Sequence, residues 1–140
     1  MKFKLRRPTI DTPFHIDWGW FERNNLSAQS AIYNQICETH RHEVAPDATE
    51  PVDYIDPATG EVFPMDPMRE MILSLCQWED DYITGEMPVN QALFRLLLAT
   101  NNRPITPSEM ASHLKRVDAN TLLRLLTSGS VSYGIVPHSS

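Results

Sequence analysis

The most regular part of this sequence is residues 88–137, which read PVNQALFRLLLATNNRPITPSEMASHLKRVDANTLLRLLTSGSVSYGIVP. Apolar side chains recur there at helical spacing in three runs, at residues 88–100, 107–114 and 118–127. A segment with alternating apolar residues, Val131, Tyr133 and Ile135, follows the last run. The stretch therefore predicts three successive helices and then a short strand or wing.

The boundaries of these helices carry their own signals. Thr106-Pro107-Ser108-Glu109 is a capping box with proline at the first helical position, so it predicts the start of the second helix. Asp118 is placed to cap the third helix, because aspartate accepts hydrogen bonds from the free N–H groups of a helix start. The turn between the second and third helices is therefore only a few residues long.

This order of elements resembles a winged helix-turn-helix domain. The resemblance is carried by residues 92–99, 103–114 and 119–126, in which the first helix ends in Asn-Arg-Pro and Thr-x-x-Glu-hydrophobic-Ala starts the second. It covers about a third of the chain, and residues 1–87 resemble no family known to us. The resemblance implies that the third helix enters the major groove of duplex DNA.

The resemblance also implies a set of contact residues. Basic residues of the turns would neutralise phosphates, and polar residues of the third helix would approach base edges. The first group is Arg103, Lys115 and Arg116, and the second is Asn120, Thr121 and Arg124. One weakly basic unit of this kind binds DNA poorly alone, so we expect a homodimer.

The charge of the chain is unevenly distributed. The 140 residues have a formal net charge of −6, which argues against a protein that coats nucleic acid by charge alone. Residues 1–9 contribute +4, residues 10–89 contribute −13 and residues 90–140 contribute +3. This pattern indicates either two functional parts or an electrostatic contact between an end and the middle.

The rest of the chain divides into two further parts. Residues 1–17 are predicted to be an extended basic arm, because Pro8 and Pro13 prevent a helix there. Residues 18–87 are predicted to be a helical region with one β-hairpin. Its expected elements are a helix from Ser27 to about His42, a hairpin of Val52–Ile55 with residues 61–63, and a helix opened by Asp66 and Pro67. With the winged-helix-like unit of residues 88–137, the fold class expected is mainly α.

Four side chains of the helical region could hold a metal ion. Cys37 and His40 are one helical turn apart, Cys76 lies in the next predicted helix, and His42 or the distant His15 could complete the set. These ligands predict a structural zinc site. The alternative is two buried thiols with both histidines on a solvated helix end, and a disulfide is the least favoured outcome in a reducing compartment.

Several functions find no support in the sequence. There is no glycine-rich phosphate loop, nucleophile elbow or two-histidine metalloprotease motif, so we expect no enzyme. The longest apolar run is residues 96–99, far short of a membrane span, and no secretory signal is visible. These features predict a cytoplasmic protein without a membrane partner.

Two hypotheses remain. In the first, the chain is a small regulator that binds duplex DNA through its C-terminal unit as an oligomer. In the second, it is an accessory subunit of a larger protein complex and uses the winged helix for protein contact.

Overall fold

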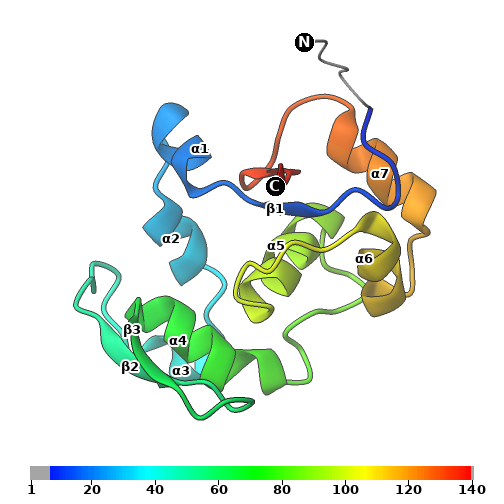
Figure 1. Ribbon diagram of the computed structural model, residues 1–140. Coiled ribbons are helices and arrows are strands. Elements are labelled where there is room, and N and C mark those ends of the chain that lie inside the picture. The colour runs from blue at the N-terminus through cyan, green and yellow to red at the C-terminus, as the bar shows by residue number, and fades with distance from the viewer. Residues whose placement is uncertain (1–6, 140) are drawn as a thin grey trace.

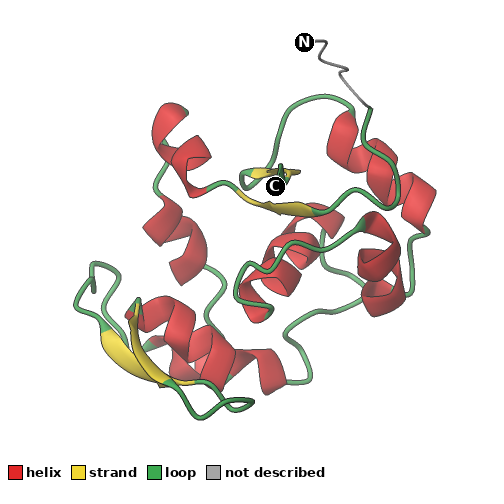
Figure 2. Cartoon of the chain, in the orientation of Figure 1, coloured by secondary structure: helices red, strands yellow, loops and turns green. Residues whose placement is uncertain are grey.

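The computed structural model describes residues 7–139 and shows a mixed α/β protein (Figures 1 and 2). Within these residues, helices outweigh strands. The helices are α1 (Trp18–Arg23), α2 (Ala28–Tyr33), α3 (Glu38–Arg41), α4 (Pro67–Ser74), the 3-10 helix η1 (Cys76–Trp78), α5 (Val89–Ala99), α6 (Pro107–Leu114) and α7 (Ala119–Thr127). The strands are β1 (Phe14–Ile16), β2 (Val52–Ile55), β3 (Val62–Met65) and β4 (Ile135–Pro137).

The four strands form two small antiparallel sheets. β1 pairs with β4, so that His15 lies opposite Val136, and β2 pairs with β3 as a hairpin. On its other side, β1 exchanges two backbone hydrogen bonds with Ile105, at 2.7 and 3.0 Å between Phe14 and Ile105. The start of the described chain is therefore held between the α5–α6 turn and the last strand.

A single hydrophobic cluster joins elements from β1 to β4, with α5 in the middle of the fold (Figure 1). α5 is amphipathic with a wide apolar face, and α4 and α6 both pack against it. The bulkiest fully buried side chains come from β1, the α2–α3 segment, α4, α5, α6, α7 and the α5–α6 turn: Phe14, Ile16, Ile36, Met68, Ile72, Leu93, Phe94, Leu97, Ile105, Met110 and Leu122. The aromatic residues of α1 contribute to this cluster, with Phe21 buried and Trp18 and Trp20 packed against it.

The predicted fold class is confirmed only in part. The chain is mixed α/β, because it contains two small sheets besides its helices. One of them, which was not predicted, pairs β1 of the predicted arm with β4. The hairpin and the three C-terminal helices lie where the sequence predicts them. Residues 1–6 of the predicted basic arm lie outside the described residues.

The helix expected from Ser27 to His42 is wrong as a single element. Ser27 does cap a helix, since its Oγ accepts a hydrogen bond from the Ser30 N–H at 3.0 Å. That helix ends at Tyr33, and α3 begins after Cys37, whose backbone is extended at φ −60° and ψ 143°. Cys37 is bonded to Cys76, and this distant partner accompanies the break between two short helices.

None of the helices in residues 7–139 is long and apolar enough to cross a membrane.

Candidate functional site

The helix pair α6–α7 is built from local capping contacts. Thr106 Oγ1 accepts a hydrogen bond from the Glu109 N–H at 3.1 Å, and Glu109 Oε1 accepts one from the Thr106 N–H at 3.0 Å. Lys115 ends α6 in the left-handed conformation, at φ 62°. Asp118 Oδ1 then accepts a hydrogen bond from the Thr121 N–H at 2.8 Å and starts α7. The predicted capping box and N-cap are both confirmed.

The turn and the first half of α7 bring together five of the six residues expected to contact DNA. Lys115, Arg116, Asn120 and Arg124 are exposed, and Thr121 is half-buried. Asn120 and Arg124 are four residues apart, so they lie on one face of α7. Arg124 Nη2 donates a hydrogen bond to Thr121 Oγ1 at 3.4 Å.

Two of the predicted cations already have partners within the chain. Arg103 lies on the turn after α5, and its Nη1 is 3.7 Å from Glu109 Oε2. Arg116 donates hydrogen bonds from both terminal nitrogens to the backbone carbonyls of Gly85 and Met87. Carbonyl acceptors leave the charge of Arg116 in place, whereas the Glu109 carboxylate offsets that of Arg103.

The two acids of this helix pair stay ionised beside the cations. Hydrogen bonding to the Thr106 N–H holds the pKa of Glu109 below its ordinary value, and Arg103 adds to the effect. The pKa of Asp118 is lowered first by the Thr121 N–H and further by Arg124. Negative charge therefore remains at the N-terminus of both helices at neutral pH.

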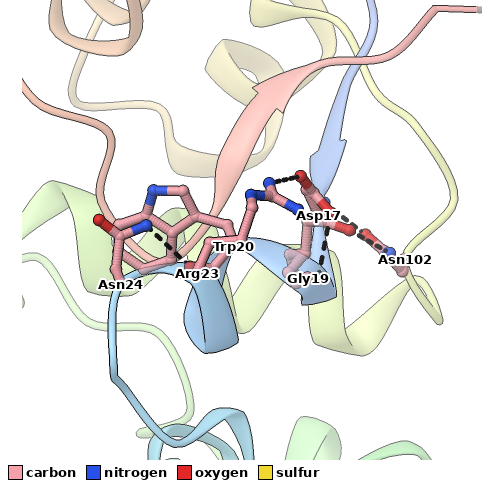
Figure 3. Close-up of polar contacts among 7 residues, drawn as sticks. Asp17, Gly19, Trp20, Arg23, Asn24 and Asn102 are labelled. Atoms are coloured by element: carbon pink, nitrogen blue, oxygen red, sulfur yellow. Dashed lines mark hydrogen bonds and ion pairs between the residues drawn. The ribbon is translucent and has the colours of Figure 1, made fainter.

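The strand β1 is fixed against this unit by the side chain of Asn102 (Figure 3). Asn102 Oδ1 accepts a hydrogen bond from the Ile16 N–H at 2.7 Å, and its Nδ2 donates one to the Ile16 carbonyl at 2.9 Å. Asp17 next caps α1 through Gly19 and pairs with Arg23 at 2.5 Å. The Asn102 contact has no local signal in the sequence, because its partner lies 86 residues away.

The loop between α7 and β4 occupies the position of the expected wing. It comprises residues 128–134, and Tyr133 stacks on Phe94 of α5 with ring centroids 4.5 Å apart. The strand expected from the alternation after Gly129 begins only at Ile135. β4 pairs with β1 and not with a second strand of a wing.

The predicted zinc ligands are brought together in part. Cys37 and Cys76 are bonded as a disulfide with their Cα atoms 5.4 Å apart. His40 Nδ1 is 2.7 Å from Glu43 Oε2, and His42 is exposed at the end of α3. Within residues 7–139, no group of three or more histidine, cysteine or acidic side chains could hold a metal ion. The structure therefore lends no support to the zinc site, which stays a prediction.

A buried polar cluster of Gln35, Tyr82 and Arg95, which no sequence motif predicts, links the two halves of the chain. Gln35 Oε1 accepts a hydrogen bond from Arg95 Nε at 2.8 Å, and Arg95 Nη1 donates another to the Tyr82 carbonyl at 2.7 Å. The Tyr82 hydroxyl donates in return to the Arg95 carbonyl at 2.6 Å. Burial raises the pKa of Tyr82 and lowers that of Arg95. The one signal in the sequence was an arginine inside the apolar run of α5.

Two of the cavities in the described part of the chain lie outside the α6–α7 surface and differ in character. One, of about 400 Å³, is polar and has Arg41, Glu79 and Arg95 on its wall. The other, of about 420 Å³, is apolar and lies between Trp20 and Tyr133. Acids and arginines offset each other in the first, and the second is open and holds only hydroxyls as polar groups. Neither arrangement indicates a specific reaction.

Comparisons of the chain with models of protein families, with curated proteins and with solved structures find no match. The resemblance of residues 88–137 to a winged helix-turn-helix domain therefore stays a prediction from the sequence.

Proposed function

We propose that the chain is a small regulator that binds duplex DNA through α6, the following turn and α7. The observation that carries this proposal is the exposed group Lys115, Asn120 and Arg124 on a capped helix pair joined by a short turn. In a helix-turn-helix, the turn lies at the phosphates and the second helix lies in the major groove. Lys115 would then contact phosphate, and Asn120 and Arg124 would approach base edges.

The arrangement around the helix pair agrees with this proposal. Ile105, between the first and second helices of the unit, pairs with β1, and β4 follows the third helix and pairs with β1 as well. Winged helices likewise cover their three helices with short strands. Here the strand β1 comes from the N-terminal part of the chain, so the unit would include residues 14–16 as well as 88–137.

A second function is favoured by one feature of α7. Leu125 is 45% exposed on the surface of this helix, whose only cation is Arg124. One cation gives α7 little attraction for phosphates, and its exposed leucine offers an apolar contact to another protein instead. The alternative is therefore an accessory subunit that docks a protein partner on α7.

Binding to a random-sequence duplex, measured against salt concentration, tests the first proposal. Lys115→Gly removes the charge and keeps the left-handed turn, because glycine adopts positive φ freely. We expect this variant to weaken binding several-fold and to reduce the slope of log affinity against log salt by about 1. Arg124→Gln should weaken binding to a comparable degree.

Arg23→Gln is the matched control, because Arg23 is an exposed arginine on α1, outside the helix pair. It changes the net charge equally and should leave DNA affinity unchanged. The DNA proposal fails if the parent protein does not bind duplex at low salt, or if Arg23→Gln weakens binding as much as Lys115→Gly. A stoichiometric protein partner that is lost in Leu125→Asp but kept in Lys115→Gly would establish the accessory subunit instead.

A further inference from the structure

The hairpin of β2 and β3 carries an exposed apolar face. Its inner face includes the buried Met65 and the aromatic pair Tyr54 and Phe63, whose rings are 5.5 Å apart. On the outer face, Ile55 and Val62 lie opposite each other and are 63% and 57% exposed. Two neighbouring β-branched side chains at this exposure form an apolar surface that nothing in residues 7–139 covers.

The outer edge of β2 has unpaired backbone groups. The Asp56 N–H donates to the Glu61 carbonyl at 2.8 Å, and bonded and non-bonded pairs alternate along an antiparallel ladder. The N–H and C=O groups of Asp53 and Ile55 therefore point away from β3. In the described part of the chain the hairpin is a two-stranded sheet, so these groups have no strand partner. The edge of β3 is blocked, because Pro64 has no N–H there.

The hairpin also lies in the most acidic part of the sequence. Between Arg41 and Arg69 there are seven acids and no lysine or arginine. Glu50 and Asp53 are exposed beside or on β2. A strand that adds to this edge must therefore bring positive charge and apolar side chains together.

The N-terminal segment of this same chain has that composition. It reads MKFKLRR, in which Lys2, Lys4 and Arg6 alternate with Phe3 and Leu5. In an added strand, this period of two puts the cations on the face of Asp53, Ile55 and Val62, where their aliphatic stems cover the two apolar side chains. It puts Phe3 and Leu5 on the other face, toward Val52 and Tyr54. We propose that residues 2–6 of one copy add as a strand to the free edge of β2 in a second copy.

The occupant is a second copy because the arm of the same copy starts on the far side of the fold. Figure 1 shows the described chain beginning beside α7, whereas the hairpin lies at the opposite end. Ile10 is anchored to α6 through the Ser108 N–H, while β2 packs on α4, and α5 lies between α6 and α4. The six residues before Arg7 span only about 20 Å when extended. The path from the start of the described chain across α6, α5 and α4 to β2 is longer than this. Reciprocal exchange of the two arms produces a two-fold symmetric dimer.

Charge reversal of each surface tests the dimer by sedimentation of the full chain without DNA. One variant carries Lys2→Glu and Lys4→Glu, and the other carries Glu50→Lys and Asp53→Lys. The side chains of Glu50 and Asp53 are exposed and make no hydrogen bond within residues 7–139. Each variant alone should raise the dimer dissociation constant at least about tenfold, because like charges then meet. An equal mixture should restore association, since the acidic arm fits the basic hairpin and the basic arm fits the acidic hairpin.

Two matched controls accompany these variants. Glu86→Lys changes an exposed acid outside the hairpin and should leave association unchanged. Ile55→Pro deletes an outward N–H without touching the bonds to β3 and should weaken association more than Ile55→Thr. A parent that is monomeric at about 1 mM, or a mixture that does not recover association, overturns the proposal. Neither result bears on DNA binding, which is measured separately.

Discussion

The N-terminal helices and the C-terminal helices of this protein are held in different ways. α1, α2 and α3 have 6, 6 and 4 residues, whereas α5, α6 and α7 have 11, 8 and 9. α3 is joined to η1 by a disulfide between residues 39 positions apart. The side chains that cap α6 and α7 accept hydrogen bonds from N–H groups only three residues further along the chain. The region of α3 and η1 therefore depends on a distant cross-link, whereas the starts of α6 and α7 are fixed by neighbouring residues.

Reduction of the Cys37–Cys76 disulfide should produce the largest loss of stability. A cross-link across 39 positions restricts the unfolded chain, and a loop of that length is worth about 4 kcal/mol in the chain-entropy model. We expect dithiothreitol to lower the free energy of unfolding by about this amount in urea titrations. Hydrogen exchange should rise first in α3 and η1, while α6 and α7 stay protected.

The double variant Cys37→Ala, Cys76→Ala is the control, because it should be insensitive to reductant. Treatment of the parent with a chelator should leave its stability unchanged. The opposite result, a loss on chelation without a loss on reduction, would establish the zinc site predicted from Cys37, His40, His42 and Cys76.

Asn102→Gly should have the next largest effect, because it removes the side-chain contact that adds to the backbone bonds between β1 and the C-terminal part. Ile16 is buried, and loss of the amide leaves its N–H and C=O without these partners. We expect a destabilisation of about 2–3 kcal/mol in urea titrations. Glycine preserves the backbone at φ 60°, so the loss measures the side chain alone.

Asn101→Gly provides the matched comparison. Asn101 has nearly the same backbone, at φ 56°, but its side chain accepts only an exposed hydrogen bond from Arg69, at 2.8 Å. Its replacement should cost less than about 1 kcal/mol. Equal losses in the two variants would show that the contact between Asn102 and Ile16 does not hold β1 in place.

The difference between local caps and distant partners explains which elements could be predicted from sequence. The starts of α4, α6 and α7 follow from Asp66, Thr106 and Asp118, because a cap and its acceptor are neighbours in the chain. The break after Tyr33 does not follow from its surroundings, since apolar spacing continues through it. It accompanies a bond to Cys76, and the periodicity of a single segment contains no information on such a partner.

The candidate site shows the same limit. Exposure of Asn120 and Arg124 could be predicted, because helical spacing on α7 places them opposite the buried Leu122. Lys115 lies in the turn before α7. The partners of Arg103 and Arg116 differ in how far they could be predicted. Glu109 is near Arg103 in sequence, but the carbonyls that bind Arg116 belong to the loop before α5, 29 and 31 residues away.

Asp118→Asn should have the smallest effect and should depend on pH. The pKa of Asp118 is lowered from 3.8 by the Thr121 N–H and by Arg124, so its ionised form is favoured in the folded state. That stabilisation is present above the unfolded pKa and is lost as pH falls through the folded pKa. Asparagine is an equally good N-cap but has no charge. The variant should therefore be less stable than the parent at pH 7 and should match it at about pH 2.

The same substitution separates the charge of Asp118 from its capping role. Urea titrations of parent and variant at both pH values give the difference directly, and Asp118→Ala, which removes the cap as well, should remain less stable than the parent at both. A gap between parent and Asp118→Asn that does not change with pH would show that the carboxylate acts only as a hydrogen-bond acceptor. Because Asp118 lies at the N-terminus of α7, its neutralisation should also strengthen duplex binding if α7 lies in the groove, and leave binding unchanged if DNA is not the ligand.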